Sequence, residues 1–353
     1  MVINVDIGYV NARLRGMKSR LLDPKEIEKL IARPDIDALI AGLEDTPYKE
    51  YIEKASISYS GIQCIEEALR KNLAETYRLM LRMVEGENFE KYIKILLAKW
   101  DIQNIKTILR GKNIHAPSDE ILECLIPAGE LDEVTLIELI RQPDVKDVID
   151  LLATWNIDYS KPLTQKFKEY NETRDLWILE FALDKYYYEN ALSKVTGNSY
   201  DAKIVRDMIT TEIDVINIKT ILQLVRDSIV IDDTKNILIE DGKVLNIDIL
   251  APLLRTKTTR EAVRQLDKTP YSFLAEIPDE QLAAGKISVY ERELDIYLIK
   301  KGISAFHGDP LSIAIAVGYL WAKYKETTNL RIISRCKTAG ILEEDLTKEL
   351  IYV

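Results

Sequence analysis

Apolar residues recur along most of this chain at the three- and four-residue spacing of amphipathic helices. Ile102, Ile105 and Leu109 fall on one face of such a helix, which predicts a single buried stripe. A second helix repeats this spacing at Val215, Ile218 and Leu222. The alternation typical of strands is weak, and only residues 229–231 and 237–239 suggest a short hairpin. The pattern therefore predicts an all-α fold.

The polar residues on these helices follow a pattern, acid-x-x-Asn-aliphatic-cation, that occurs three times. Its members are Asp101, Asn104 and Lys106, then Asp214, Asn217 and Lys219, and then Glu326, Asn329 and Arg331. The acids stand at positions 101, 214 and 326, so the interval between copies is nearly constant. Four further markers keep nearly the same interval or twice it: Gly86, Gly197 and Gly308; Glu180-Leu183-Asp184-Tyr186 and Glu291-Leu294-Asp295-Tyr297; Thr46-Pro47-Tyr48 and Thr269-Pro270-Tyr271; and Pro34-Asp35 and Pro143-Asp144. Such self-similarity predicts three copies of one unit.

We place the three units at residues 1–115, 116–228 and 229–353. Each unit joins long helices to a shorter helical segment rich in turn residues, at residues 30–52, 139–159 and 253–274. A proline followed by an aspartate suits the start of a helix, where the acid meets the positive end of the helix dipole. No linkers rich in Pro, Gly or Ser separate the units, so we expect them to share packing. Three units of this size favour a funnel-like, three-lobed pseudo-symmetric arrangement over an extended array.

The composition is that of a folded protein with an acidic surface. Hydrophobic residues make up 47% of the 353 residues and charged residues 30%, and the formal net charge is −10. This charge argues against nucleic acid and anionic lipid as partners. The longest apolar run, residues 311–322, is too short to cross a bilayer, so we expect membrane association only through a partner. Three scattered cysteines and the absence of an apolar leader suggest a reducing cytoplasm.

Residues that could perform chemistry are sparse. The two histidines, His115 and His307, lie far from any cysteine and from each other, so the spacing of a zinc site is missing. Neither a P-loop nor the G-x-G-x-x-G or G-x-S-x-G pattern occurs. We therefore expect a non-catalytic protein without cofactor or metal.

Two sets of residues are candidates for structural or interface roles, and each has two interpretations. The repeated acid, asparagine and cation could fix helix packing inside each unit, which we favour, or form a ring of polar groups that faces a partner. Tyr186, Tyr187 and Tyr188 cannot share one helix face, so they could pack against a neighbouring unit or form a tyrosine-rich contact surface. The apolar run at 311–322 should belong to the core of the third unit, with an exposed patch as the alternative.

The strings WDIQNIKTILRGK, IDVINIKTILQLV and TTNLRIISRCKTAGI, with LDKYYYENAL and YVNARLRGMKSRLL, resemble the family of C subunits of archaeal/V-type ATP synthases, the counterparts of the d subunit of eukaryotic vacuolar ATPases. The resemblance covers the whole chain. It implies a three-lobed helical funnel on the cytoplasmic face of the membrane, present as one copy per complex. This peripheral central-stalk protein would receive the rotor shaft and pass torque to the proteolipid ring, which couples proton or sodium transport to ATP synthesis or hydrolysis. The departures are Gln223-Leu224-Val225 in place of Arg-Gly-Lys, and Glu326 and Arg331 in place of Asp and Lys.

Two other function classes remain open on the residues alone. A helical-repeat scaffold that binds proteins would show an open groove and repeats of about 30–50 residues. A helical enzyme with an unrecognised carboxylate site would show a pocket with converging polar groups and perturbed acids. The rotor connector is the interpretation that we carry forward.

Overall fold

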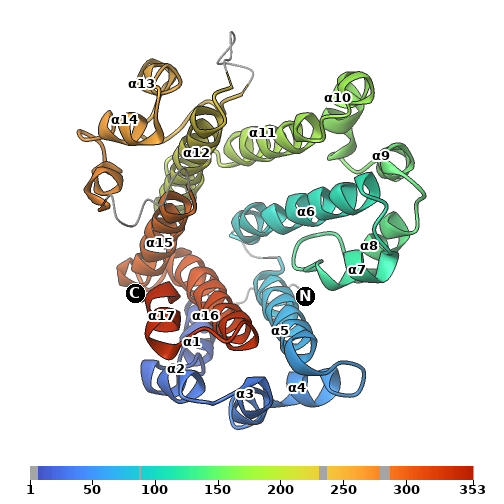
Figure 1. Cartoon of the computed structure of the whole chain (residues 1–353), viewed down its shortest axis with the longest axis vertical. Helices are drawn as coiled ribbons and strands as arrows, with labels where there is room; N and C mark the ends of the chain where they lie inside the picture. Colours follow the sequence, from blue (N-terminus) through green and yellow to red (C-terminus); the bar gives the residue numbers. More distant parts are fainter. Residues whose placement is uncertain (1–6, 87–88, 230–236, 279–286, 353) are drawn as a thin grey trace. The chain divides into compact units, whose positions relative to one another are not determined.

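The computed structural model describes residues 7–86, 89–229, 237–278 and 287–352. Within these ranges every regular element is a helix, which confirms the predicted all-α class (Figure 1). Of the hairpin expected between 229 and 239, residues 230–236 lie outside these ranges and residues 237–239 form no strand. No helix in the described part of the chain is long and apolar enough to cross a membrane.

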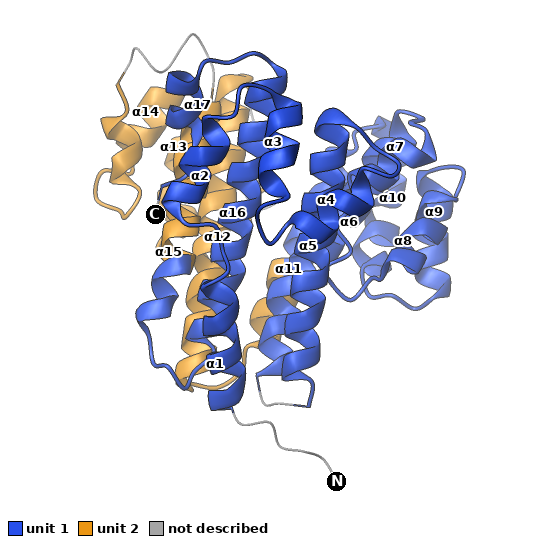
Figure 2. Cartoon of the chain, turned by 90° about the horizontal axis from the view of Figure 1, so that it is seen from below, with its two compact units in different colours: residues 1–187, 303–353 blue, residues 188–302 orange. Residues whose placement is uncertain are grey.

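The helices divide into two compact units (Figure 2). Unit 1 comprises residues 1–187 and 303–353, and unit 2 comprises residues 188–302. Unit 1 holds α1 (Ile7–Lys18), α2 (Pro24–Ile31), α3 (Ile36–Leu43), α4 (Lys49–Ala55), α5 (Gly61–Val84), α6 (Glu90–Asn113), α7 (Ser118–Glu123), α8 (Glu133–Ile140), α9 (Val145–Thr154), α10 (Ser160–Thr173), η4 (Ala305–His307), α16 (Ala314–Thr338) and α17 (Glu343–Glu349). Unit 2 holds α12 (Tyr200–Arg226), α13 (Ile247–Leu253), α14 (Thr259–Arg264) and η2 (Ser272–Glu276). The boundaries between the units fall within α11 (Trp177–Lys194) and near the end of α15 (Ser288–Ser304).

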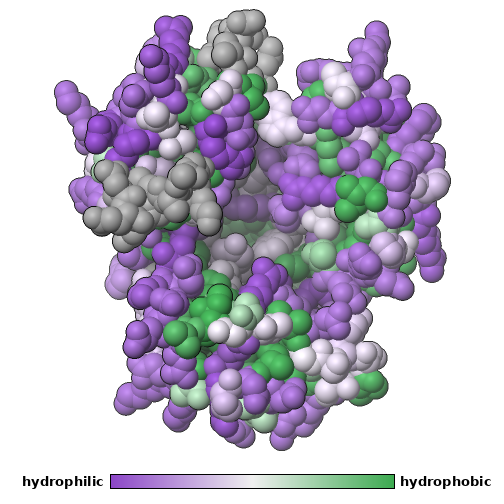
Figure 3. All heavy atoms as spheres, viewed as in Figure 1, coloured by the Kyte–Doolittle hydropathy of each residue, from purple (hydrophilic) through white to green (hydrophobic). Residues whose placement is uncertain are grey.

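The core of unit 1 joins the two ends of the chain. Residues of α2 to α5 form one apolar cluster with residues of α16 and α17, although these segments lie at opposite ends of the sequence. The predicted stripe on α6 is buried, since Ile102, Ile105 and Leu109 are at most 3% exposed. Hydrophilic residues cover most of the surface on the face seen in Figure 3, as expected for amphipathic helices.

The apolar run at 311–322 lies at the start of α16, and its side chains are largely buried. Ile313 and Val317 are fully buried, whereas Leu311 is 62% exposed. At Gly318 an added Cβ would lie 2.8 Å from the Phe306 ring, so the glycine permits this ring to pack directly against the helix backbone. The burial agrees with a place in the core.

The helices that carry the repeated polar pattern, α6, α12 and α16, end in the same way. The second residue after each helix has a positive φ, at His115 (56°), Ser228 (54°) and Gly340 (68°). The next N–H then bonds a carbonyl five residues back, at 2.9–3.0 Å, in three pairs: Ala116 to Gly111, Ile229 to Leu224, and Ile341 to Cys336. This is the Schellman geometry that commonly ends helices.

The Pro-Asp pairs mark helix starts, as the sequence predicts. Asp35 and Asp144 are the N-cap residues of α3 and α9, and each accepts a hydrogen bond from the backbone three residues on, at 2.8 and 3.0 Å. Each proline precedes the cap and so lies outside the helix. The caps satisfy N–H groups that otherwise have no partner inside the helix.

Candidate functional site

The repeated asparagine binds the backbone of an isoleucine in the segment that follows its helix. The Asn104 Nδ2 donates to the Ile126 carbonyl at 2.7 Å, and its Oδ1 accepts the Ile126 N–H at 2.8 Å. The same two bonds occur in two further pairs, at 2.8 and 2.9 Å for Asn217 with Ile239, and at 3.1 and 2.9 Å for Asn329 with Ile351. The three asparagines are at most 5% exposed. Each one therefore ties the middle of a long helix to the chain segment that follows that helix.

The repeated acid binds a second point of the same segment in the first two copies. Asp101 accepts the N–H groups of Glu130 and Leu131 at 2.9 and 3.0 Å, and the Tyr159 hydroxyl at 3.3 Å. Asp214 has the equivalent partners at 2.9–3.2 Å, namely Val244, Leu245 and Tyr271. Both carboxylates are fully buried.

A glycine makes the close approach to each of these carboxylates possible. A Cβ on Gly129 would lie 2.2 Å from the Asp101 Oδ1, and a Cβ on Gly242 would lie 2.2 Å from the Asp214 Oδ1. No side chain fits at either position without displacing the acid. Gly242 stands as far beyond Gly129 in the sequence as Asp214 stands beyond Asp101, so both glycines belong to the same repeat.

In the third copy two partners of the acid come from the other end of the chain. Glu326 accepts the Leu22 N–H at 2.5 Å and the Tyr48 hydroxyl at 2.7 Å. Its third partner is Lys323, whose Nζ lies 2.6 Å from the carboxylate and is also buried. Tyr48 takes the place that Tyr159 and Tyr271 hold in the other copies. The N-terminal segment therefore completes the polar contacts of the C-terminal helix α16.

Burial sets the protonation of these groups. It raises the pKa of Asp101 to about 6, although the Leu131 and Glu130 N–H groups act in the opposite direction. Burial also raises the pKa of Asp214, again against its N–H donors. The pKa values of Tyr159 and Tyr271 rise through burial and through the neighbouring carboxylate, so both hydroxyls stay protonated and can donate.

The repeated cation reaches a different long helix. The Nζ of Lys106 in α6 lies 2.7 Å from Asp184 in α11, and the Nζ of Lys219 in α12 lies 2.7 Å from Asp295 in α15. In the third copy, Arg331 in α16 bonds Glu66 in α5 at 3.0 Å. We call each set of acid, asparagine and cation, with the groups that they bind, a junction.

The acids that bind these cations belong to a second sequence pattern that also repeats. Asp184 and Asp295, with Glu180 and Glu291, belong to a marker that recurs in the sequence at nearly the interval of the polar pattern. The structure pairs Glu180 with Arg110 at 2.6 Å and Glu291 with Gln223 at 3.0 Å, one turn beyond the repeated cation. The sequence shows both the repeated cations and these repeated acids, but we did not predict that they pair with each other. Their common period was the signal that could have predicted the pairing.

The tyrosine run divides between buried and partly exposed positions. Tyr187 and Tyr188 are each 4% exposed, and the Tyr188 hydroxyl bonds Glu212 at 3.3 Å. Tyr186 is half-buried and meets the Tyr159 ring edge-on, with 6.3 Å between the ring centroids. Two of the three rings are therefore packed within the chain.

Among the described residues, no group of three or more His, Cys, Asp or Glu side chains could hold a metal ion. His115 and His307 lie in different parts of unit 1, one after α6 and the other in η4. Each repeated acid is enclosed by one or two backbone N–H groups and a tyrosine hydroxyl, and Glu326 also by the Lys323 ammonium group. This arrangement holds helices together.

Comparison with known proteins shows the family to which this chain belongs. A family model for the ATP synthase (C/AC39) subunit matches residues 10–349. The chain is 34% identical to the C subunit of the A-type ATP synthase of Methanococcoides burtonii, over 97% of this chain and 93% of that protein. It is 31% identical to the protein of the same name from Methanosarcina barkeri (98% and 92% covered), and 29% identical to that of Methanocaldococcus jannaschii (99% and 88% covered). The chain therefore belongs to the ATP synthase (C/AC39) subunit family.

Proposed function

We propose that this chain is the non-catalytic connector in the rotor of an archaeal-type rotary ATP synthase or ATPase. It would join the central shaft of the catalytic head to the membrane proteolipid ring and pass torque between them. Proton or sodium transport would thereby be coupled to ATP synthesis or hydrolysis. Membership of the family, and the naming of the relatives as C subunits of A-type ATP synthases, support this role.

The observation that carries the proposal is the junction, which occurs three times. In each copy the asparagine binds an isoleucine backbone, the acid accepts a tyrosine hydroxyl, and the cation pairs with an acid on another long helix. A part that transmits torque must resist sliding between its helices. A helix that slips by one residue moves about 1.5 Å along its axis, which is enough to break both hydrogen bonds of a buried asparagine. Breaking them would leave the backbone groups of Ile126 or Ile239 buried without partners, at a high free-energy cost. The junctions would therefore resist the sliding of a long helix against the segment that it binds.

We further propose that the junctions relate three modules in a pseudo-symmetric, three-lobed arrangement. Each module would consist of a long helix and the segment that follows it, and the N-terminal segment would complete the third. The expected unit boundaries at 115/116 and 228/229 are bridged by the pairs Asn104–Ile126 and Asn217–Ile239. The contact of Glu326 with Tyr48 joins the last predicted unit to the first. Contacts of this kind would resist separation of the three predicted units.

The partners that we propose are the shaft subunits of the head and the proteolipid ring, with one copy of this chain in each complex. The chain would lie on the cytoplasmic face of the membrane and bind it through the ring. A net charge of −10 would favour association with basic surfaces of such partners.

Affinity purification from native membranes tests the proposal. The chain would carry an affinity tag, and an unrelated acidic helical protein with the same tag would serve as the control. We expect shaft and ring subunits to copurify with the chain and not with the control. Recovery of unrelated proteins alone, from membranes in which the assembled ATPase is intact, would instead support a general binding scaffold.

A further inference from the structure

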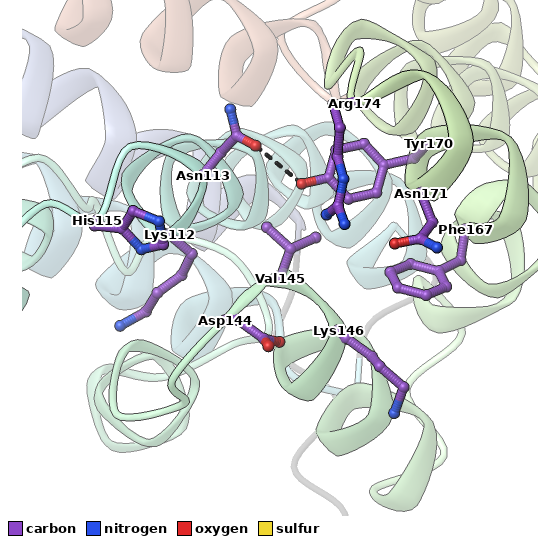
Figure 4. Close-up of a pocket in the computed structure, with 10 residues that line it drawn as sticks. All are labelled: Lys112, Asn113, His115, Asp144, Val145, Lys146, Phe167, Tyr170, Asn171 and Arg174. Atoms are coloured by element: carbon purple, nitrogen blue, oxygen red, sulfur yellow. Dashed lines mark hydrogen bonds between the residues drawn. The ribbon is translucent and has the colours of Figure 1, made fainter.

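A half-open cavity of about 630 Å³ lies in unit 1 at the end of α6. Figure 4 shows His115 and Lys112 on one side of it and Phe167 and Asn171 on the other, with Val145 between them. The remaining lining residues are Asn113, Asp144, Lys146, Tyr170 and Arg174. The volume falls in the range of sites for small molecules, which is typically about 300–1,000 Å³.

The cavity exists because α10 is long. The helix that follows Tyr48 in the third junction, α4, has 7 residues, whereas α10, which follows Tyr159, has 14. The additional turns bring Phe167, Tyr170 and Arg174 to the end of α6, where the Tyr170 hydroxyl bonds Asn113 at 2.9 Å. The cavity is thus a feature of this copy of the repeat and lies outside the junction itself.

Cations outnumber acids around this cavity, although the chain as a whole is acidic. Its lining holds Lys112, Lys146 and Arg174 against Asp144 alone. Asp144 caps α9, and Lys146 pairs with Asp150 at 2.6 Å on the exposed face of that helix. The side chains of Lys112 and Arg174 have no ion pair or hydrogen bond with any described residue. Two positive charges are therefore left without a counter-charge.

Lys112 is the less expected of the two, because it is only 8% exposed. Burial lowers its pKa, since no neighbouring acid compensates for the lost hydration. The lysine at the same place in the last turn of α16, Lys337, donates to the Ile31 carbonyl at 2.7 Å and also to the Arg33 carbonyl. Lys112 has no such carbonyl partner among the described residues. The stem of Lys112 is thus buried while its ammonium group stays open to the cavity, where a bound anion could pair with it.

We propose that this cavity binds a small phosphate-bearing molecule, with the phosphate held between Arg174 and Lys112. The guanidinium group can bind phosphate through two parallel hydrogen bonds, and the ammonium group adds a compact charge. The Nδ2 of Asn113 is left to donate because its Oδ1 accepts from Tyr170. Phe167 and Val145 offer apolar surface to the rest of the ligand.

Titration calorimetry on the full chain, at constant ionic strength, tests the proposal with inorganic phosphate, pyrophosphate and ATP as probes. Succinate provides a carboxylate control. We expect saturable binding of at least one phosphate-bearing probe and weaker binding of succinate. Arg174→Gln should weaken the binding about tenfold or more, because it removes charge-assisted hydrogen bonds. Lys166→Gln on the exposed face of α10, where Lys166 pairs with Glu169, should leave it unchanged.

Lys112→Gln provides a second variant, and circular dichroism confirms that each variant folds. The proposal is overturned if no phosphate-bearing probe binds saturably, if succinate binds equally well, or if neither Arg174→Gln nor Lys112→Gln weakens binding. It is also overturned if vesicles of phosphatidylcholine with phosphatidic acid recruit the chain through Arg174, since the phosphate would then belong to a lipid. The copurification experiment above does not depend on any of these results.

Discussion

Replacing Asn104 with alanine removes the side chain that joins α6 to Ile126. Two hydrogen bonds are lost, at 2.7 and 2.8 Å, and the N–H and carbonyl of Ile126 become buried groups without a partner. A lost bond costs about 0.5–1.5 kcal/mol, and a stranded buried group costs about 1–3 kcal/mol. Partial relaxation and the higher helix propensity of alanine offset some of this. We therefore expect the free energy of unfolding to fall by about 2–4 kcal/mol.

Urea denaturation followed by circular dichroism at 222 nm measures this change, and amide hydrogen exchange locates it. Gln103→Ala is the matched control, because Gln103 is the exposed neighbour on the same helix. The control should change the free energy of unfolding by less than about 0.5 kcal/mol. In Asn104→Ala the Ile126 amide should exchange faster. A destabilisation no larger than that of Gln103→Ala would refute the account of the junction.

Three further changes test the same structure by urea denaturation. Gly129→Ala should cost about 1–3 kcal/mol because its Cβ would overlap the Asp101 carboxylate, whereas Gly16→Ala, with open space around it, should stabilise α1 by about 0.5–1 kcal/mol. Ser228→Gly should raise the free energy of unfolding by about 0.5–1 kcal/mol, since φ is 54° there; no gain would argue against the left-handed conformation. The pKa of Asp101 is about 6 in the folded chain and about 4 when unfolded, so the folded chain binds more protons between these values. The free energy of unfolding should therefore fall by up to about 3 kcal/mol as pH rises through this window, and Asp101→Asn should flatten the slope.

The sequence is sufficient to predict the helices from local periodicity, and the repeat from markers that recur at a nearly constant interval. The stripe at Ile102, Ile105 and Leu109 is buried as expected. An asparagine in the interior of a helix needs a positional reason. Its recurrence at one interval allowed either a role in helix packing, which we favoured, or a polar ring that faces a partner. The bonds to Ile126 supply that reason.

The partners in the junctions could not be predicted in the same way. Each asparagine binds the backbone of an isoleucine. Because nearly every residue type offers the same backbone groups, the sequence does not mark this partner. Tyr48 and Glu326 are 278 residues apart, so no local pattern connects them. The cavity beside Lys112 depends on the length of α10 and the direction in which it leaves Tyr159, which only the folded chain determines.

The most direct test of the proposed rotor role is ion transport by the complete ATPase in vesicles, measured with and without this chain. The account predicts that complexes stripped of the chain hydrolyse ATP without moving protons or sodium ions into the vesicles. Adding the chain back should restore ion transport that is coupled to ATP hydrolysis. Full transport by complexes that lack the chain would contradict the proposal that it joins the shaft to the ring.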